Sequence, residues 1–275
     1  MTAPLPPPRK HLGQNFLIDP NIVRKIVSAA ALAPTDTVLE IGPGRGALTR
    51  QLCEQAASVV AVEIDPLLAR HLRESLADCP TLTLHEADAL SWSFEQVPVG
   101  TVVLANLPYY ISTELLFRIL EAGERFSRAV VMLQAEVAQR LVAQPGTKDY
   151  GILSVLTQLT AEPRILFRVS AECFRPRPDV ASSVVSLTMR PIPTGDRRQA
   201  EIPARATIAA LVRAAFAHRR KTLVNSLRDA GYGVEGAVVL DALRRIGLDA
   251  NVRAETLSVA QFVDLAGWLF PPAAS

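Results

Sequence analysis

The stretch "TVLEIGPGRGALTRQLCEQAASVVAVEID", residues 37 to 65, decides the fold of this chain. A short β-branched run, "TVLEIG", leads through glycines into the helical pattern "GALTRQLCEQAA", and a second apolar run, "VVAVEID", follows. Parallel strands need a long crossover connection, which is usually a helix, and the helical pattern between these two runs provides one. The stretch therefore predicts a strand-helix-strand unit.

The same alternation continues along the chain. "TLTLHEAD" (81–88), "TVVLAN" (101–106) and "AVVMLQ" (129–134) read as further strands, with segments between them long enough for helices, such as "PLLARHLRESLAD" (66–78). A helix is also expected over residues 22–32. Repeated strand and helix favours a parallel sheet covered on both faces, so we predict an α/β, Rossmann-like fold.

The pattern changes near residue 190. "MRPIPTGDRRQAEIPARA" (189–206) is rich in proline and charge and indicates a linker. Beyond it the periodicity is helical, in "TIAALVRAAFAHRRKTLVNSLRDA", "VEGAVVLDALRRIG" and "SVAQFVDLAGWLF". We predict two domains, an α/β domain over residues 1–192 and a small all-α domain over residues 193–275.

Composition narrows the class of protein. The chain has 275 residues, of which 49% are hydrophobic, enough for a full core. No apolar run reaches the roughly 18 residues of a membrane helix, and prolines stand where a secretory signal would be apolar, so we expect a cytoplasmic protein. The three cysteines form no CxxC pair and the four histidines show no ligand spacing, so no metal site is predicted.

Ligands of an open parallel sheet bind beyond the carboxyl ends of its strands. Gly42 and Gly44 allow a tight turn there, and Gly46 is predicted to begin a helix with free N–H groups. Glu63, 21 residues past Gly42, has the spacing of an acid that accepts two ribose hydroxyls. Both NAD and S-adenosylmethionine carry that ribose. Asp88 could accept an adenine amine, or could cap a helix over "ALSWSF".

The stretch "LANLPYYIST" (104–113) ends a predicted strand with an amide, a proline and two tyrosines. The side-chain oxygen of Asn106, with a main-chain carbonyl of Leu107 or Pro108, could accept both N–H groups of an aromatic amine and direct its lone pair outward. Tyr109 could supply a flat face for a base drawn out of its stack. We interpret the motif as a clamp for an amino-bearing ring.

A structural alternative exists for the same motif. The strand could end in a plain proline turn, with Ser112 or Thr113 capping the next helix.

Positive charge is clustered, although the net charge is only +2. "RPRP" (175–178) and "HRRK" (218–221) are basic, and Arg213 and Arg228 flank the second run. Phosphate binding depends on local density of Lys and Arg, so these clusters are candidates for contact with nucleic acid. The alternative is a solvated helix face.

Taken together, these motifs resemble the KsgA/RsmA family of ribosomal RNA adenine dimethyltransferases, which are relatives of the Erm resistance methyltransferases. The matching segments are "GQNFLID" (13–19), "EIGPGRGALT" (40–49), "VEID" (62–65), "DAL" (88–90), "NLPYYIS" (106–112), "YGILSV" (150–155), "FRPRPDVASSVV" (174–185), "FAHRRKTLVNSL" (216–227) and "RAETLS" (253–258). The pair of NLPY and F-x-P-x-P-x-V-x-S is highly specific, whereas the glycine motif is not.

The resemblance implies a seven-stranded class I methyltransferase sheet with a helical C-terminal domain and S-adenosylmethionine as cofactor. It implies that Asn15 and Leu17 close over the cofactor, that Gly42 lies under its amino-acid end, that Glu63 holds the ribose and that Asp88 reads the adenine. Asn106 would serve both the cofactor and the target.

For the target, the resemblance implies that Tyr109 and Phe174 stack on the base from opposite sides, although core packing is the alternative for Phe174. The reaction would place two methyl groups on each of two adjacent adenosines near the 3′ end of small-subunit (16S) ribosomal RNA. The expected RNA contacts are Arg175, Arg177, Arg219, Arg220 and Lys221. One departure is visible, because Tyr110 stands where the family commonly has Asn or another polar residue.

Three other functions remain as alternatives. A nicotinamide oxidoreductase would share the glycine turn and Glu63, but would need neither NLPY nor Phe174. An Erm-type enzyme would methylate large-subunit RNA and confer antibiotic resistance. A mainly non-catalytic ribosome assembly factor would not need the intact Glu63, Asp88 and Asn106. We expect the protein to act as a monomer on small-subunit RNA within an assembling subunit, with a role in ribosome biogenesis.

Overall fold

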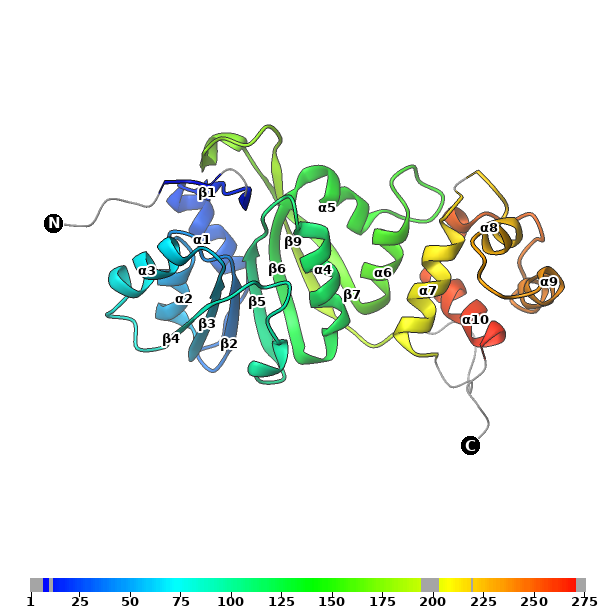
Figure 1. The fold of residues 1–275 in the computed structure, drawn as a ribbon, viewed down its shortest axis with the longest axis horizontal. Coiled ribbons are helices and arrows are strands. Elements are labelled where there is room, and N and C mark those ends of the chain that lie inside the picture. Colours follow the sequence, from blue (N-terminus) through cyan, green and yellow to red (C-terminus); the bar gives the residue numbers. More distant parts are fainter. Residues whose placement is uncertain (1–6, 10–11, 194–202, 219, 271–275) are drawn as a thin grey trace. The chain divides into compact units, whose positions relative to one another are not determined.

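The computed structural model describes residues 7–9, 12–193, 203–218 and 220–270. The chain forms two compact units (Figure 1). The α/β unit comprises Met1–Ala138 and Ala161–Met189, and the helical unit comprises Gln139–Thr160 and Arg190–Ser275. The helical unit thus takes in a segment that lies before the predicted boundary at residue 193. Most of the predicted linker, residues 194–202, lies outside the described residues.

A seven-stranded sheet in the order β4-β3-β2-β5-β6-β9-β7 forms the α/β unit (Figure 1). Neighbouring strands from β4 to β6 are parallel, and β9 is antiparallel to both β6 and β7. The order reverses between β2 and β5, which is the position where such sheets bind ligands. The strands are β2 (Thr37–Ile41), β3 (Ser58–Glu63), β4 (Leu82–Glu86), β5 (Thr101–Asn106), β6 (Phe126–Gln134), β7 (Ala161–Val169) and β9 (Ser182–Met189).

The predicted Rossmann-like α/β fold is confirmed, and so are the five parallel strands read from the sequence. The sequence patterns did not identify β7 and β9. They also missed a small antiparallel sheet in which β1 (Phe16–Leu17) pairs with β8 (Phe174–Arg175). Two residues are too few for a period-2 pattern, so β1 exists only through its partner.

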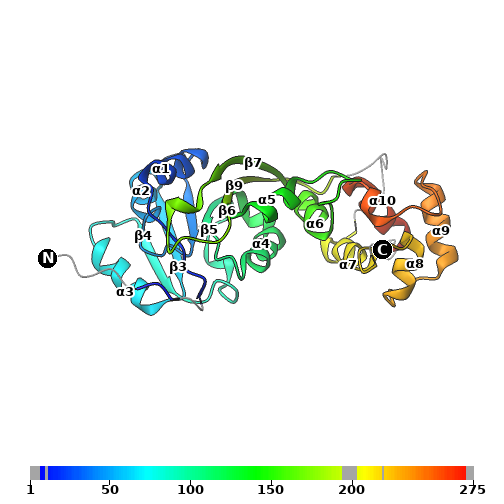
Figure 2. The ribbon, with the colours of Figure 1, turned by 90° about the horizontal axis from the view of Figure 1, so that it is seen from above.

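Helices cover the sheet on both faces. In Figure 2, α1 (Pro20–Ala29) and α2 (Thr49–Gln55) lie on one face and α4 (Ser112–Glu121) lies on the other. Asp19 starts α1, because its carboxylate accepts the N–H groups of Asn21 and Ile22 and so satisfies donors that the helix leaves unpaired. The unit also contains α3 (Pro66–Ser75), and α5 (Ala135–Val142) follows β6.

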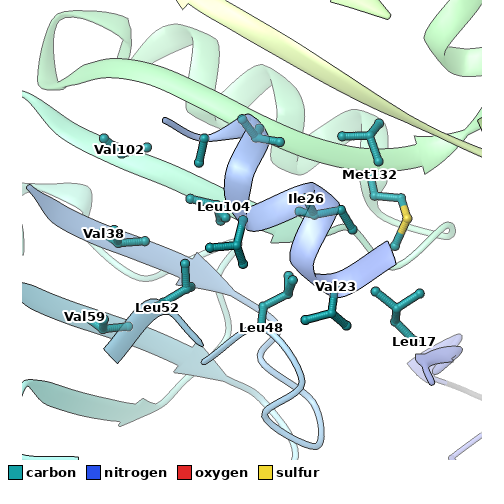
Figure 3. Close-up of a cluster of buried hydrophobic side chains, with 14 of the residues drawn as sticks. Leu17, Val23, Ile26, Val38, Leu48, Leu52, Val59, Val102, Leu104 and Met132 are labelled. Carbon is teal, nitrogen blue, oxygen red and sulfur yellow. The ribbon is translucent and has the colours of Figure 1, made fainter. Parts of the chain in front are cut away.

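The core beneath α1 and α2 is apolar and tightly packed (Figure 3). Val38 and Leu52 are both fully buried, and burying side chains of this size contributes roughly 1.5–3 kcal/mol each. This cluster fixes the strands whose carboxyl ends carry the predicted site. Its labelled members are Leu17, Val23, Ile26, Val38, Leu48, Leu52, Val59, Val102, Leu104 and Met132.

The helical unit is built from helices that pack against one another. Its helices are α6 (Ile152–Thr160), α7 (Arg205–Ala215), α8 (Leu223–Asp229), α9 (Gly236–Arg245) and α10 (Val259–Leu269). The Tyr150 hydroxyl donates to the Leu257 carbonyl at 2.7 Å, which ties the segment before α6 to the C-terminal helices. The helical pattern over residues 207–230 is divided between two helices, because α7 ends at Ala215 and α8 begins at Leu223. The described residues of the basic run, His218, Arg220 and Lys221, therefore lie between these helices and not on a helix face.

Two absences hold for the described part of the chain. None of its helices combines the length and apolarity needed to cross a membrane. Nor does it contain a cluster of three or more His, Cys, Asp or Glu side chains suited to a metal ion.

Candidate active site

One cavity in the α/β unit collects every residue that the sequence assigned to the cofactor or the target. It opens at the carboxyl ends of β2, β3 and β5, beside the N-terminal segment. Parallel strands bring these ends to one edge, which is why residues so distant in sequence converge. The predicted residues on its wall are Asn15, Leu17, Gly42, Glu63, Asp88, Asn106, Leu107, Pro108, Tyr109 and Phe174.

The glycine turn leads directly to Glu63. The Glu63 side chain, only 4% exposed, accepts the Gly44 N–H at 3.0 Å and the Asp65 N–H at 2.9 Å. These two bonds fix the carboxylate. Gly44 has φ of 60°, and a Cβ there would come within 3.2 Å of the Phe16 ring. The turn therefore needs glycine both for its conformation and for its close approach to the N-terminal segment.

The predicted helix start at Gly46 is wrong. Gly46 has φ of 80°, a left-handed conformation, and α2 begins at Thr49. A Cβ at Gly46 would lie 2.9 Å from a Leu72 methyl carbon, so this glycine serves packing against α3. The turn keeps its bonds to Glu63 although the helix starts later.

A second buried acid, Glu40, lies in the wall of the same cavity. It is 1% exposed, and burial raises its pKa to about 8, with the negative charge of Glu63 acting in the same direction. Burial likewise raises the pKa of Glu63, against the two backbone N–H bonds and with the charge of Asp65. Among the described residues, no group hydrogen-bonds to Oε2 of Glu40. A ligand that carries positive charge would lower both pKa values again and stabilise the ionised carboxylates.

The structure decides one of the two roles left open for Asp88, that of a helix cap. Asp88 lines the cavity, and its Oδ1 accepts the Leu90 N–H at 2.8 Å. The expected helix over "ALSWSF" is absent from this described segment, which forms turns before a short 3₁₀ helix at Phe94–Gln96. Asp88 therefore caps a turn while it faces the site.

At the end of β5, Asn106 has a defined orientation. Its Nδ2 donates to the Asn15 carbonyl at 3.3 Å, so the side-chain Oδ1 is the end left to accept from an incoming amine. Leu107 N–H bonds the Met132 carbonyl at 3.0 Å and holds the loop to β6. The Pro108 carbonyl accepts the Ile111 N–H at 3.2 Å, which makes the Leu107 carbonyl the better second acceptor.

Tyr109 stands half-buried beside these acceptors. Its hydroxyl bonds the buried Ser182 hydroxyl at 2.6 Å, and burial raises its pKa. The proline turn of the structural alternative is present, but the expected cap by Ser112 or Thr113 is wrong. Ile111 occupies the N-cap position of α4 without a side-chain bond, and the Ser112 hydroxyl instead donates to the Tyr109 carbonyl at 3.1 Å. That bond joins the first residue of α4 to the turn before it. The Tyr109 ring is held separately, by the hydrogen bond between its hydroxyl and Ser182.

Phe174 has a more enclosed position than the sequence suggested. It is 1% exposed and belongs to the core cluster, while it also lines the cavity. Core packing, the alternative given above, therefore describes this conformation. Stacking on a base is supported by the resemblance alone.

The N-terminal segment closes one side of the cavity. β1 pairs Phe16 with Arg175 and Leu17 with Phe174, which joins the two ends of the α/β unit's sequence. The Asn15 side chain donates to the Gly13 carbonyl at 3.1 Å. Residues 13–17 therefore form a short ordered wall beside Asn106.

The cations predicted to meet RNA belong to both units of the chain. Arg175 donates to the carbonyls of Glu172 and Phe174, and Arg177 lies 3.9 Å from Glu172. Arg220 and Lys221 lie in the loop between α7 and α8 of the helical unit, where Lys221 pairs with Asp229. Arg219 lies outside the described residues.

Sequence reasoning missed two features of the site. Glu40 was passed over, although an acid at an inward position of the run "TVLEI" is a signal of function in itself. Arg45 also lines the cavity, and its guanidinium lies 4.2 Å from the centre of the Phe16 ring. No sequence spacing predicts that contact, because the two residues belong to separate elements.

These residues fit S-adenosylmethionine. Its sulfonium and ammonium groups suit a cavity lined by Glu40, Glu63 and Asp88, and the unpaired Glu40 oxygen can accept a hydrogen bond. When bound, the cofactor supplies an activated methyl group. The sheet, the glycine turn with its acid and the Asn-Leu-Pro-Tyr strand end define an S-adenosylmethionine-dependent methyltransferase.

Comparisons with known proteins specify the class further. Residues 8–270 match the family model described as ribosomal RNA adenine dimethylase, and the chain belongs to this family. Ribosomal RNA small subunit methyltransferase A of Pelotomaculum thermopropionicum is 45% identical over 271 residues, covering 94% of this chain and 90% of that protein. The protein of the same name from Moorella thermoacetica is 43% identical over 270 residues, covering 94% and 91%.

Two solved structures agree with this membership. A dimethyladenosine transferase from Plasmodium falciparum has a TM-score of 0.76 at 26% identity, covering 91% of this chain and 95% of that one. The 23S rRNA methyltransferase ErmE has a TM-score of 0.68 at 28% identity, covering 93% and 99%. The predicted resemblance, the fold class, the cofactor and the activity as an rRNA adenine dimethyltransferase are confirmed.

Proposed function

We propose that this enzyme acts on small-subunit (16S) ribosomal RNA, where it dimethylates two adjacent adenosines near the 3′ end. The relatives that are more than 40% identical over nearly the whole chain carry the name small subunit methyltransferase A. We further propose that it works as a monomer in the cytoplasm, on a small subunit still being assembled. The division into a methyltransferase domain (1–192) and a helical RNA-binding domain (193–275) belongs to the same proposal.

One observation carries the proposal. Glu63 and Asp88, which suit a nucleoside, share a single cavity wall with Asn106 and Tyr109, which suit an adenine amine. A methyl donor and an acceptor base can therefore be held next to each other, and holding reactants in line is the main requirement of a displacement at a methyl carbon.

On the cofactor side, we assign binding to the wall formed by the glycine turn and the acids. Glu63 would hold the ribose hydroxyls with its fixed carboxylate, and Asp88 would read the adenine amine. Gly42 would lie under the amino-acid end. Asn15 and Leu17 would close the pocket from the N-terminal side.

On the target side, the adenine amine is a poor nucleophile because its lone pair is delocalised into the ring. Asn106 Oδ1 and the Leu107 carbonyl would accept its two N–H groups and localise that lone pair, with Pro108 fixing the turn between acceptors and ring. Tyr109 would stack on the flipped base. Phe174 would complete the stack from the opposite side.

Contacts with RNA phosphates would come from Arg175, Arg177, Arg219, Arg220 and Lys221. All five are cations, and the four that the structure describes are exposed: Arg175, Arg177, Arg220 and Lys221. Such contacts position the substrate without reading its sequence.

To test this proposal, the purified enzyme is incubated with radiolabelled S-adenosylmethionine and small subunits that lack their dimethyladenosines. Large-subunit RNA is tested in a parallel reaction. Dimethylation removes the Watson–Crick donor, so reverse transcription stops at each modified base. We expect paired stops near the 3′ end of the small-subunit RNA. Stops only in large-subunit RNA would establish the Erm-type alternative, and transfer to neither RNA would contradict both.

A further inference from the structure

Tyr110 is the one residue of the "NLPYY" run that the proposed reaction leaves without a role. Its side chain is 54% exposed, unusual for a ring of this size, yet it lines the cavity. Its neighbour Tyr109 is tethered through its hydroxyl to Ser182. The two adjacent tyrosines therefore lie in different surroundings and suit different tasks.

The Tyr110 ring packs against the backbone of Gly13. A Cβ added at Gly13 would lie 2.9 Å from Cδ1 and 3.5 Å from Cε1 of Tyr110. Gly13 also has φ of 57°, so only glycine fits without strain. The ring and the N-terminal segment thus meet directly over the cavity.

The segment that carries Gly13 is anchored at its other end. Gln14 Nε2 donates to Asp65 Oδ2 at 3.0 Å, and Arg9 Nε lies 3.4 Å from the same oxygen. Asp65 is 1% exposed and stands two residues after Glu63. Tyr110 therefore contacts a strap, residues 12–15, that is fixed beside the strand end carrying the ribose acid.

Electrostatics place Tyr110 on the cofactor side of the cavity. Burial raises the pKa of Tyr110, and the negative charges of Asp88 and Glu63 raise it further. The hydroxyl therefore lies within electrostatic reach of both carboxylates, which are the groups assigned to the adenine and the ribose. Tyr109 shows no such dependence on these acids.

We propose that Tyr110 is a positioning residue for the nucleoside part of S-adenosylmethionine, and that its ring and Gly13 form a clasp that retains the cofactor and its product. The proposal rests on the cofactor site proposed above. An aromatic side chain suits this place because the Tyr110 ring can stack on the flat face of the cofactor's adenine, and stacking of a base on an aromatic side chain is strong. A polar residue such as Asn, common here in the family, would leave the pocket more open.

The test measures binding of S-adenosylhomocysteine without RNA, by calorimetry, together with its release rate by stopped-flow dilution. We expect Tyr110→Ala to weaken binding about tenfold, mostly through faster release, since loss of one aromatic stack has this size. Tyr110→Phe keeps the ring and should stay within roughly threefold of the wild type. Leu166→Ala removes a 40%-exposed side chain on β7 and serves as the matched control.

A double-mutant cycle isolates the contact with Gly13. Gly13→Ala should weaken binding in the wild type, and weaken it less when Tyr110 is already alanine, because the collision with the ring is then removed and only the strain of the positive φ stays. Equal effects in both backgrounds would contradict the clasp.

Glu63→Gln separates failure of this inference from failure of the proposed site. If Glu63→Gln loses S-adenosylhomocysteine and Tyr110→Ala binds it like the wild type, the clasp is wrong and the site stands. If both variants bind normally, the site itself is wrong. If Tyr110→Ala loses affinity only for RNA, the ring serves the target, which also overturns the clasp.

Discussion

The cavity of the α/β unit and the basic loop of the helical unit, which carries Arg220 and Lys221 between α7 and α8, place their ionisable groups in opposite surroundings. In the cavity, Glu40 and Glu63 are almost fully buried, and burial shifts their pKa values upward. In the loop, Arg220 and Lys221 are exposed, and Lys221 makes a surface ion pair with Asp229. Burial makes the ionised form of such acids costly, so their charge depends strongly on their immediate partners, whereas exposed charges act additively and are screened by salt.

The largest effect should follow loss of the Asn106 side chain. Asn106→Ala removes the oriented acceptor and should lower methyl transfer about a hundredfold or more, the usual cost of losing one preorganised group at a reacting centre. S-adenosylhomocysteine binding should fall far less. Single-turnover transfer and calorimetry on the same preparation measure the two effects.

Asn106→Asp provides the matched comparison for this variant. It keeps acceptor oxygens but loses the Nδ2 bond to the Asn15 carbonyl, so we expect activity between that of Asn106→Ala and the wild type. Equal loss of transfer and of cofactor binding in Asn106→Ala would contradict the separation of the two sides of the cavity.

The next effect concerns Glu63. Glu63→Gln loses the charge and places an N–H₂ group against a backbone N–H, so S-adenosylhomocysteine affinity should fall about 10- to 100-fold, the range for a hydrogen bond to a charged group. Isothermal calorimetry measures it. Glu121→Gln, an exposed change on α4, should bind like the wild type.

The sequence predicted which residues converge in the cavity where a recognisable strand end carries a recognisable motif. Glu63 and Asn106 follow apolar runs of unmistakable strand character, and the parallel topology alone brings them together. Glu40 was not predicted, because the apolar run that contains it indicates a strand and masks the single acid at an inward position. Contacts between separate elements, such as Gly13 with Tyr110, leave no periodic signal.

The helical unit shows the opposite limit. Its helices were predicted from their periodicity, but the break between α7 and α8 was not, since "AHRRK" contains neither Gly nor Pro. A bond between the two helices stabilises the break, because the Ser226 hydroxyl donates to the Ala215 carbonyl at 2.8 Å, and the Thr222 side chain caps α8 locally. The bond from Ser226 exists only once the helices have packed.

Glu40 gives a pH-dependent effect on stability. Its pKa is about 8 when folded and 4.5 ordinarily, so between these values the folded protein holds a proton that the unfolded chain has released. The free energy of unfolding should therefore fall as pH rises through this window, by up to about 1.4 kcal/mol per pH unit. Glu40→Gln should flatten that slope in urea unfolding, and Glu54→Gln, exposed on α2, should not.

The smallest effect should come from the basic loop. Arg220→Ala with Lys221→Ala removes two exposed cations, which should weaken RNA binding several-fold and reduce the slope of log affinity against log salt by about 1 to 2. S-adenosylhomocysteine affinity should stay unchanged, since neither residue lines the cavity. Filter binding across a salt series measures the slope.

Arg244→Ala with Arg245→Ala on α9 is the matched control, because it removes the same charge from exposed pairs with Asp241. An identical slope for both double variants would mean that net charge alone attracts RNA, and that the loop has no special contact.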